Sequence, residues 1–316
     1  MTRLTLPARK PFNFTSVVNS HGWSQLAPFS SDEAANSLGY TFQLADGRVV
    51  QLTMRDGKDA LIVETDKLDR TERKEVLDKA AWMFGLDMDF SRFYAASRAE
   101  PKLARARKRA LGRVLRSPTL FEDVIKTILT TNTLWTATKN MTRKLVDTFG
   151  VALTHLHCIR SAVQVSYPLG SGAGGVDEAP NQKAFPLPAA IAASSPEYLK
   201  ETVRVGYRAS AIHQLAVRVA SGEFDLESLK TSELPTLELR KALMTINGVG
   251  PYAAANLLLI LGRSDFIPID SWALKLVSHE WYKGKPITAR EVEKRFEKWG
   301  EFKGLAFWFW DWTYNQ

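Results

Sequence analysis

A glycine-rich turn followed by an aspartate is the part of the chain whose residue types and spacing most suggest chemistry. The turn, residues 246–250 with the sequence INGVG, separates two apolar segments, so the pattern predicts two helices joined by a tight turn. Gly248 and Gly250 would let backbone N–H groups approach an anion, and Pro251 suits the first turn of a helix, whose N-terminus attracts negative charge. The stretch predicts a phosphate contact, with a corner that only packs as the alternative. Asp270 follows it by about twenty residues.

The overall composition favours a polyanionic partner. The 316 residues include 42 Lys or Arg against 34 Asp or Glu, which gives a formal net charge of +8. Such a basic balance attracts nucleic acid or an anionic surface, although a generally basic solvated surface is the alternative. With 45% hydrophobic residues, the chain can bury a sizeable core.

Cysteine usage and hydropathy exclude several classes of protein. The single cysteine, Cys158, excludes an intrachain disulfide, a four-cysteine iron–sulfur cluster and a four-cysteine zinc site, and it indicates a reducing compartment. His155 and His157 stand beside it, but no second ligand cluster lies at a suitable spacing, so we expect no metal site there. The N-terminus lacks the apolar core of a signal peptide, and no apolar run reaches the roughly 18 residues of a membrane span. We expect a soluble intracellular protein with no membrane partner.

The N-terminal part of the chain has a β-rich pattern. Residues 40–44, 49–54 and 60–63 are strand-like runs separated by Asp46-Gly47 and Asp56-Gly57, whose residue types suit the positive φ angles of hairpin turns. They predict an antiparallel meander. From Thr71 the apolar period becomes helical, and Gly85 suits the end of that helix.

The order of these signals predicts an α+β protein. We expect an N-terminal antiparallel β-sheet domain with its first helix at 1–98 and a helical domain at 99–235 that contains a flexible Gly- and Pro-rich loop, residues 168–181. Residues 236–316 would hold the glycine turn, Asp270 and C-terminal helices that pack with the helical core.

Between the sheet and the glycine turn, two segments suggest contact with a partner. Residues 101–116 contain seven Lys or Arg and no acid, which suits either phosphate neutralisation or a solvated helix face. Ser117 and Pro118 are typical of an N-cap and a first helical residue, so a helix is expected to run from there to about residue 129. Four polar residues, 130–133, would then present Asn132 from a turn before a second helix that begins near Trp135.

Further helical signals follow in the second half of the chain. They lie at 188–193 and after Ser195, an N-cap followed by a proline. Gly206 breaks the chain just before another helix and places Tyr207 and Arg208 at its start. The aromatic residues of segment 305–312 have helical spacing, which is typical of core.

Together these motifs resemble the helix-hairpin-helix DNA glycosylase superfamily. The resemblance rests on GVG at 248–250, PID at 268–270, VGYRA at 205–209, LRSPTLFEDVIKTILTTN at 115–132 and the β-rich N-terminus. It covers nearly the whole chain from about residue 12. Within the superfamily, the chain is most similar to the branch that contains 3-methyladenine DNA glycosylase II and 8-oxoguanine DNA glycosylase.

The resemblance implies that Asp270 is the catalytic carboxylate. Breaking an N-glycosidic bond develops positive charge on the sugar, which a nearby carboxylate can stabilise while it orients or deprotonates water. The alternative is that Asp270 only caps a helix over 271–279, and both roles are compatible. Asp265 is the second candidate for the carboxylate.

The resemblance also implies the DNA-binding groups. Gly248, Val249 and Gly250 match the superfamily's phosphate anchor, and the carbonyls of Met244, Ile246 and Val249 match a structural Na⁺ or K⁺ site. Asn132 corresponds to the residue that fills the gap left by an extruded base. Tyr207 and Arg208 correspond to the pair that wedges the duplex and probes the opposite strand. No other cofactor is expected.

Two positions and the cysteine count depart from parts of the superfamily. Tyr252 stands where bifunctional relatives carry a lysine that attacks the sugar, so a Schiff base cannot form there. Ala137 stands where the 8-oxoguanine enzymes carry an arginine that reads the opposite cytosine, and one cysteine cannot bind the iron–sulfur cluster of the endonuclease III branch. Tyr252 and Trp272 are expected as walls of an aromatic base pocket.

The expected function is therefore monofunctional base excision repair. The protein would hydrolyse the N-glycosidic bond of a flipped alkylated purine in double-stranded DNA, in the manner of 3-methyladenine DNA glycosylase II. A monomer is expected, in the cytoplasmic nucleoid of a bacterium or in a eukaryotic nucleus. The alternatives are a glycosylase for an oxidised purine, a deaminated base or a mismatched base, and a non-catalytic helix-hairpin-helix DNA-binding protein.

Overall fold

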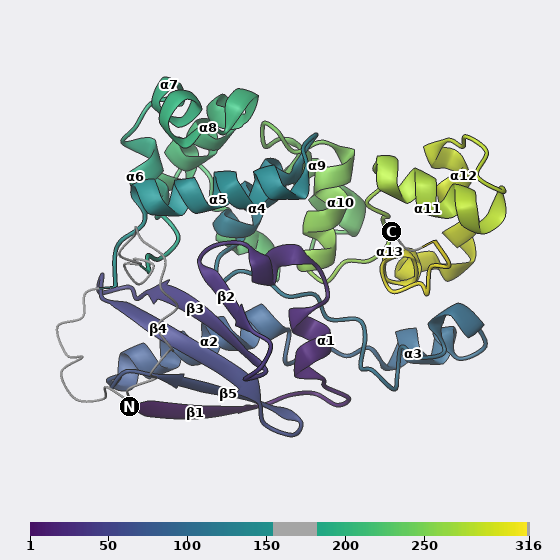
Figure 1. The fold of residues 1–316 in the computed structure, drawn as a ribbon, viewed down its shortest axis with the longest axis horizontal. Helices are drawn as coiled ribbons and strands as arrows, with labels where there is room; N and C mark the ends of the chain where they lie inside the picture. Colours follow the sequence, from purple (N-terminus) through teal and green to yellow (C-terminus); the bar gives the residue numbers. More distant parts are fainter. Residues whose placement is uncertain (154–181, 315–316) are drawn as a thin grey trace, which may run out of the picture.

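The N-terminal part forms one antiparallel sheet of five strands (Figure 1). The computed structural model describes residues 1–153 and 182–314. The strands are β1 (Thr2–Pro7), β2 (Phe29–Asp32), β3 (Ser37–Gln43), β4 (Val49–Asp56) and β5 (Ala60–Thr65), in the order β1-β5-β4-β3-β2. The helical remainder follows the sheet, which confirms the predicted α+β fold class.

The middle three strands were predicted and the two edge strands were not. Strands β3, β4 and β5 contain the runs at 40–44, 49–54 and 60–63, apart from one residue of the first run. Gly47 has the expected positive φ of 93°, but in the next turn the positive φ angles belong to Lys58 and Asp59 rather than to Gly57. The edge strands β1 and β2 pair with β5 and β3, so long-range pairing rather than local pattern places them.

Helix α2 (Arg70–Phe84) has clear sequence signals at both ends. Asp69 and Glu72 form a reciprocal capping box at its start, and Gly85 ends it in the left-handed conformation with φ 55°. Helix α2 contacts the sheet at β1, and the short α1 (Phe14–Val18) contacts it at β4. The boundaries agree with the predicted helix that ends at Gly85.

The basic segment 101–116 is not a solvated helix face, which corrects that expectation. Only Pro101–Leu103 is helical, as a single 3₁₀ turn. The Arg113 and Arg116 side chains are buried, and the Arg113 guanidinium donates to four backbone carbonyls, those of Arg9, Pro11, Gly85 and Met88. Two of the seven basic residues therefore tie chain segments together, because a buried guanidinium needs acceptors for its five N–H donors.

The helical part begins with α4 (Leu120–Thr130) and α5 (Trp135–Phe149). The N-cap of α4 is Thr119, whose hydroxyl accepts the N–H of Glu122, so the predicted start at Ser117-Pro118 lies two residues too early. The later helices are α6 (Pro188–Ala192), α7 (Pro196–Tyr198), α8 (Ala209–Ala220), α9 (Thr236–Met244), α10 (Pro251–Ile260), α11 (Ser271–Trp281), α12 (Ala289–Phe296) and α13 (Lys303–Trp308). Short helical turns lie at Gly22–Gln25, Leu199–Val203, Gly206–Arg208, Glu227–Thr231 and Glu297–Phe302.

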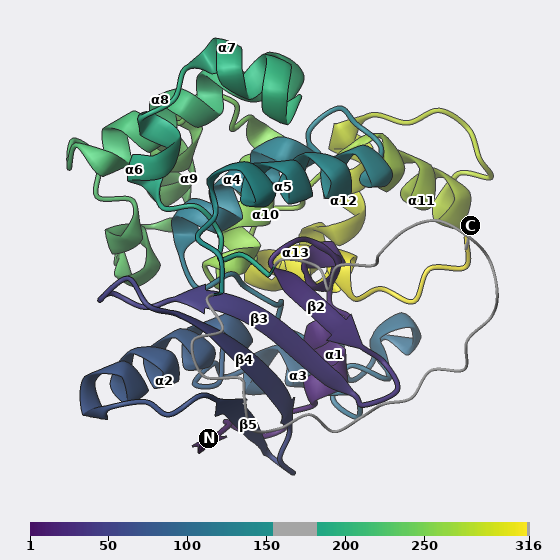
Figure 2. The same cartoon turned by 60° about the vertical axis from the view of Figure 1, so that its left-hand side comes forward.

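Helix α4 lies at the centre of the helical part. It is buried along almost its whole length and contacts α5, α10 and the turn at Glu227–Thr231. Figures 1 and 2 both show the sheet on one side of the molecule and helices α4–α10 on the other, and Figure 1 shows α11–α13 grouped at one end. Because α4 is central, its residues can contact both the sheet and the cavities described below.

The C-terminal aromatic residues are mostly core, as predicted. Phe307, Phe309 and Trp310 are buried, whereas Trp308 is half-buried. Helix α3 (Ser91–Ser97) contacts this end of the chain, with the rings of Phe93 and Phe302 6.0 Å apart. The predicted domain boundaries at 98 and 235 stay predictions. No helix within the described ranges has both the length and the apolarity needed to cross a membrane.

Candidate active site

The glycine turn joins α9 to α10 as predicted, and Pro251 is the first residue of α10. Gly248 has φ +83°, and a Cβ there would lie 3.2 Å from the Ala211 Cβ, so both the backbone conformation and the packing require glycine. Gly250 differs, with φ −86° and no heavy atom within 4 Å of a Cβ built on it. One glycine shapes the turn and the other leaves its outer face open.

An open cleft of about 970 Å³ begins at this turn. It is bordered by residues from four separate parts of the chain: the end of α4, the start of α8, the glycine turn with the start of α10, and the start of α11. Every predicted DNA-contacting residue lines it, together with Tyr252 and Asp270: Asn132, Tyr207, Arg208, Gly248, Val249 and Gly250. Neither Asp265 nor Ala137 lines it.

A second, smaller cavity of about 380 Å³ adjoins the cleft. The two share Thr130, Thr133, Tyr252 and Asp270 in their linings, so Asp270 and Tyr252 lie where they meet. Trp272, the other predicted wall, lines the smaller cavity only. We call this smaller cavity the aromatic pocket, because its lining includes five large aromatic side chains, those of Trp23, Trp135, Tyr252, Trp272 and Trp308.

Asp270 is the N-cap of α11, as the alternative interpretation predicted. Its Oδ1 accepts the backbone N–H of Ala273 at 2.8 Å, and its side chain is half-buried. The other oxygen makes no hydrogen bond to any of the described residues. The cap therefore fixes the carboxylate beside a helix N-terminus while one oxygen stays available at the junction of cleft and pocket.

Sequence reasoning missed three of the aromatic walls, Trp23, Trp135 and Trp308. Each indole N–H has a protein acceptor: Asp123 Oδ1 at 2.7 Å, Gln25 Oε1 at 2.9 Å and the Ser20 carbonyl at 2.8 Å, respectively. Trp135 also packs so closely on Gly22 that a Cβ at this glycine would lie 2.2 Å from the ring. Because the N–H groups are already bonded, these walls offer a ligand apolar aromatic surface rather than donors.

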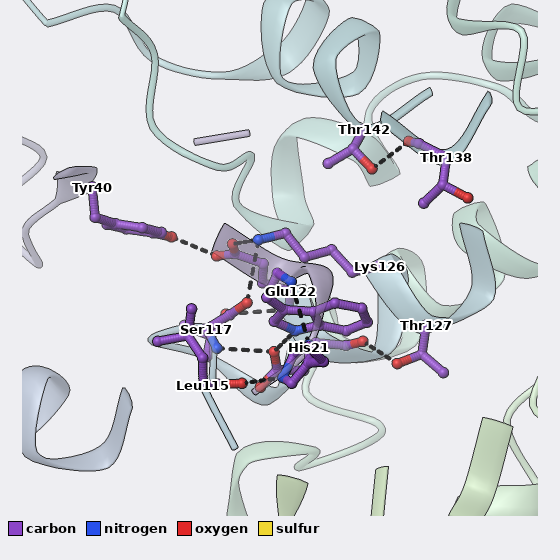
Figure 3. Close-up of polar contacts among 12 residues, drawn as sticks. His21, Tyr40, Leu115, Ser117, Glu122, Lys126, Thr127, Thr138 and Thr142 are labelled. Atoms are coloured by element: carbon purple, nitrogen blue, oxygen red, sulfur yellow. Dashed lines mark hydrogen bonds and ion pairs between the residues drawn. The ribbon is translucent and has the colours of Figure 1, made fainter. Parts of the chain in front are cut away.

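His21 lines the same pocket and was also missed. Its Nε2 lies 2.7 Å from the Leu115 carbonyl, and its Nδ1 accepts the backbone N–H of Trp23 at 3.3 Å. Burial lowers the pKa of His21 to about 4, against the opposing effect of the Leu115 hydrogen bond, so the imidazole is neutral near pH 7. Its one proton is committed to Leu115 (Figure 3), and the ring cannot readily protonate a ligand.

Tyr207 lines the cleft but, unlike Tyr252, does not line the aromatic pocket. Its side chain is 65% exposed, and its hydroxyl lies 3.2 Å from the Thr131 hydroxyl and 3.3 Å from the Asn132 amide nitrogen. Asn132 has φ 47°, so the turn after α4 presents it in the left-handed conformation. Arg208 is buried beneath Tyr207, and its guanidinium donates to the carbonyls of Ile128 and Thr131. Arg208 therefore supports the two exposed residues, Tyr207 and Asn132.

Two expectations about metal ions concern the glycine turn and the segment around Cys158. The residues that would supply carbonyls, Met244, Ile246 and Val249, all line the cleft, and the Ile246 carbonyl also accepts the Val249 N–H at 3.0 Å. A set of neutral oxygens suits a hard cation. A Na⁺ or K⁺ ion at the turn stays a prediction. His155, His157, Cys158 and the loop 168–181 lie outside the described residues.

A Gly250→Ala variant tests whether the turn contacts DNA. The added methyl group fits this φ angle and meets no protein atom, so we expect the fold to be retained. It would stand on the open face of the turn and weaken binding to a short duplex by about tenfold, the effect of one lost backbone–phosphate contact. Fluorescence anisotropy at fixed salt measures this.

A matched control is Gly222→Ala. Gly222 also has open space around it but a positive φ of 77°, so alanine there costs stability of about 1 kcal/mol. Gly222 does not line the cleft, and its variant should bind DNA as the wild type does. Wild-type affinity in Gly250→Ala would instead support a turn that only packs.

The chain is similar in sequence pattern and in fold to known DNA repair proteins. The family model described as "HhH-GPD superfamily base excision DNA repair protein" matches residues 125–302. The fold is similar to that of a 3-methyladenine DNA glycosylase from Archaeoglobus fulgidus, with TM-score 0.68 and 21% identity over 98% of this chain and 97% of that one. It is also similar to an 8-oxoguanine glycosylase/lyase from Clostridium acetobutylicum, with TM-score 0.68 and 18% identity over 98% and 95%. A structure of MBOgg1 with a low-affinity DNA ligand gives TM-score 0.70 and 25% identity over 98% and 94%. No curated protein sequence matches the chain.

Proposed function

The chain belongs to the HhH-GPD superfamily of base excision DNA repair proteins, and from this premise we propose that it is a monofunctional glycosylase for alkylated purines. The observation that carries the proposal is the position of Asp270, a fixed carboxylate where the open cleft meets the aromatic pocket. A glycosylase needs this arrangement, because the base must leave the helix stack while its sugar stays with the backbone.

In the proposed reaction, each cavity holds a different part of the substrate. The cleft would hold the DNA backbone, with the glycine turn against a phosphate, Asn132 filling the gap left by the flipped base and Tyr207 wedging the duplex. The flipped base would enter the aromatic pocket, which places the sugar beside Asp270. The carboxylate would then stabilise the positive charge that develops on the sugar and activate water for attack.

The pocket's chemistry favours a base that needs no protonation to leave. Of its lining residues, only His21, Tyr252 and Asp270 can titrate. His21 is neutral with its proton bonded, and burial, with Asp270 nearby, raises the pKa of Tyr252, which makes the phenol a weak acid. Alkylated purines that already carry a positive charge have a weakened glycosidic bond and are attracted to aromatic faces. The pocket therefore fits this class better than it fits neutral lesions.

The absence of a nearby amine supports a monofunctional enzyme. Tyr252 stands where cleft and pocket meet, at the position that corresponds to the lysine of bifunctional relatives. Among the described residues, no lysine lines either cavity. A lyase would need such an amine to form a Schiff base with the sugar. One protein of similar fold is a glycosylase/lyase, so the lyase alternative deserves a direct test.

A lesion panel tests the proposed substrate. Duplexes that each carry one alkylated, oxidised, deaminated or mismatched base are incubated with the protein, and abasic sites are then cleaved with alkali. We expect cleavage of the duplex with a cationic alkylated purine at a rate at least about tenfold above the others, the selectivity that a cation–π difference of about 1.4 kcal/mol provides. Release of only oxidised or mismatched bases would contradict the proposed substrate.

The same reactions also test the absence of lyase activity. With borohydride present, a Schiff base would be trapped as a covalent protein–DNA adduct, and without alkali a lyase would still break the strand. We expect neither adduct nor break from the wild-type protein. A trapped adduct would show that another amine reaches the sugar and would overturn the monofunctional assignment.

A further inference from the structure

A buried carboxylate stands behind one wall of the aromatic pocket. The indole N–H of Trp23 donates to Asp123 Oδ1 at 2.7 Å, and the backbone N–H of Ser117 donates to the same oxygen at 2.9 Å. Asp123 is fully buried and does not line the pocket, whereas Trp23 does. Asp123 can therefore reach a bound base only through Trp23.

The charged groups around Asp123 make their contacts with other partners, although the buried Arg116 Nε has none among the described residues. Glu122 and Lys126, on the same helix α4, form a buried pair at 2.6 Å, and Glu122 also accepts from the Tyr40 hydroxyl of β3 at 2.5 Å (Figure 3). Lys230 pairs with Glu227 at 2.6 Å. The Arg116 guanidinium donates to the Trp82 carbonyl and the Met88 sulfur. Within the described chain, no cation forms an ion pair with Asp123, and its Oδ2 has no hydrogen-bond partner.

This arrangement would polarise the pocket wall. A carboxylate that accepts the indole N–H places negative charge at the ring edge and raises electron density on the ring faces. Hydrogen-bonded groups in a low-dielectric interior polarise one another more strongly than they do in water. An electron-rich indole attracts a cation more strongly than an unpolarised one does.

We infer that Asp123 is a positioning residue that acts through Trp23 to set the preference of the aromatic pocket for positively charged bases over neutral ones. The inference rests on the proposed function, since it concerns how the same pocket selects its substrate. It assigns a role in specificity to a residue that contacts neither DNA nor base.

The titration of Asp123 gives the preference a pH dependence. Burial raises the pKa of Asp123 to about 7, against the hydrogen bonds from Ser117 and Trp23. The carboxylate, and with it the cation preference, is present above this pKa and is lost as the pH falls through 7. His21, the other titratable group beside Trp23, has a pKa of about 4 and stays neutral over this range. Burial and Glu122 raise the pKa of Tyr40, so the phenol stays neutral as well.

The test compares two bases of nearly the same shape. One duplex carries 3-methyladenine, which stays a cation between pH 6 and pH 8, and the other carries its neutral isostere 3-methyl-3-deazaadenine, both on 2′-fluoro sugars that resist hydrolysis. The ratio of their dissociation constants measures cation preference without any chemistry. For Asp123→Asn at pH 8 we expect this ratio to fall about fivefold, with affinity for the neutral duplex unchanged. At pH 6 the wild-type ratio should approach that of the variant.

A second variant keeps the test decisive. Trp23→Phe retains an aromatic wall but removes the N–H that joins it to Asp123, so it should lose the same preference, and adding Asp123→Asn to it should change nothing further. An unchanged ratio in folded Asp123→Asn, or equal effects of Asp123→Asn with and without Trp23, would overturn the inference. If the wild type itself does not distinguish the two duplexes, the proposed substrate class fails instead.

Discussion

An Asp270→Asn variant is expected to release bases about 10³-fold more slowly than the wild type while binding DNA equally well. General-base and electrostatic contributions of a single carboxylate are of this size. Asparagine is as good an N-cap as aspartate, so the hydrogen bond to the Ala273 N–H and the start of α11 should be preserved. Single-turnover base release and duplex affinity, measured on the same preparation, separate the loss of charge from any loss of fold.

The matched control for this variant is Asp69→Asn. Asp69 is also an N-cap aspartate, at the start of α2, and its side chain accepts the N–H of Glu72 at 2.9 Å. It lines neither the cleft nor the aromatic pocket. Its variant should release bases at the wild-type rate. Equal activity of Asp270→Asn and the wild type would instead mean that Asp270 only caps its helix.

A Lys126→Ala variant is expected to lower the free energy of unfolding by about 3–5 kcal/mol. Lys126 and Glu122 are both almost fully buried and lie 2.6 Å apart, so removing the lysine leaves an uncompensated carboxylate in the core. The same lysine lies 4.5 Å from the centre of the Phe29 ring, so the truncation also leaves a cavity between α4 and the sheet. Urea unfolding at pH 7 measures the loss.

The exposed pair Lys74–Asp78 provides the contrast. It has the same i,i+4 spacing on a helix and the same 2.6 Å separation, but its side chains are 78% and 62% exposed. Lys74→Ala should cost less than about 0.5 kcal/mol, since solvent screens such pairs. If the two alanine variants were equally stable, the buried pair would be no more important to the fold than a surface pair.

Local sequence signals predicted the parts of the site that depend on neighbouring residues. The glycine turn, the N-cap at Asp270 and the polar turn at Asn132 each follow from short-range backbone requirements, and all three stand in the structure where they were expected. Such features need only a few residues in sequence order, because caps and turns close within three or four positions.

The aromatic pocket could be predicted only in part, because its walls come from distant parts of the chain. Tyr252 and Trp272 lie near the turn and Asp270, but Trp23, Trp135 and Trp308 precede or follow them by dozens of residues. Each of these tryptophans fits an ordinary core pattern. Only the tertiary arrangement of the turn at Gly22–Gln25, α5 and α13 brings them to one cavity.

Charged residues were the least predictable feature. The pattern of segment 101–116 suited either phosphate neutralisation or a solvated helix face, and both would expose Arg113 and Arg116. Nothing in the sequence marked Glu122 or Asp123 as buried. The structure buries all four, with partners in segments as far away as Arg9 and Tyr40. A charged residue is buried only where distant groups supply its hydrogen bonds, and a single sequence does not reveal those groups.

We propose that Asp270 drives hydrolysis of a cationic base held in the aromatic pocket, and detection of the freed base tests this role most directly. A duplex with a single 7-methylguanine is incubated with wild type or Asp270→Asn, and the products are examined by mass spectrometry before any alkali is added. We expect the wild type to yield intact 7-methylguanine and an unbroken strand with one abasic site, and the variant to yield almost none. No free base from the wild type, or equal amounts from both proteins, would contradict the claim.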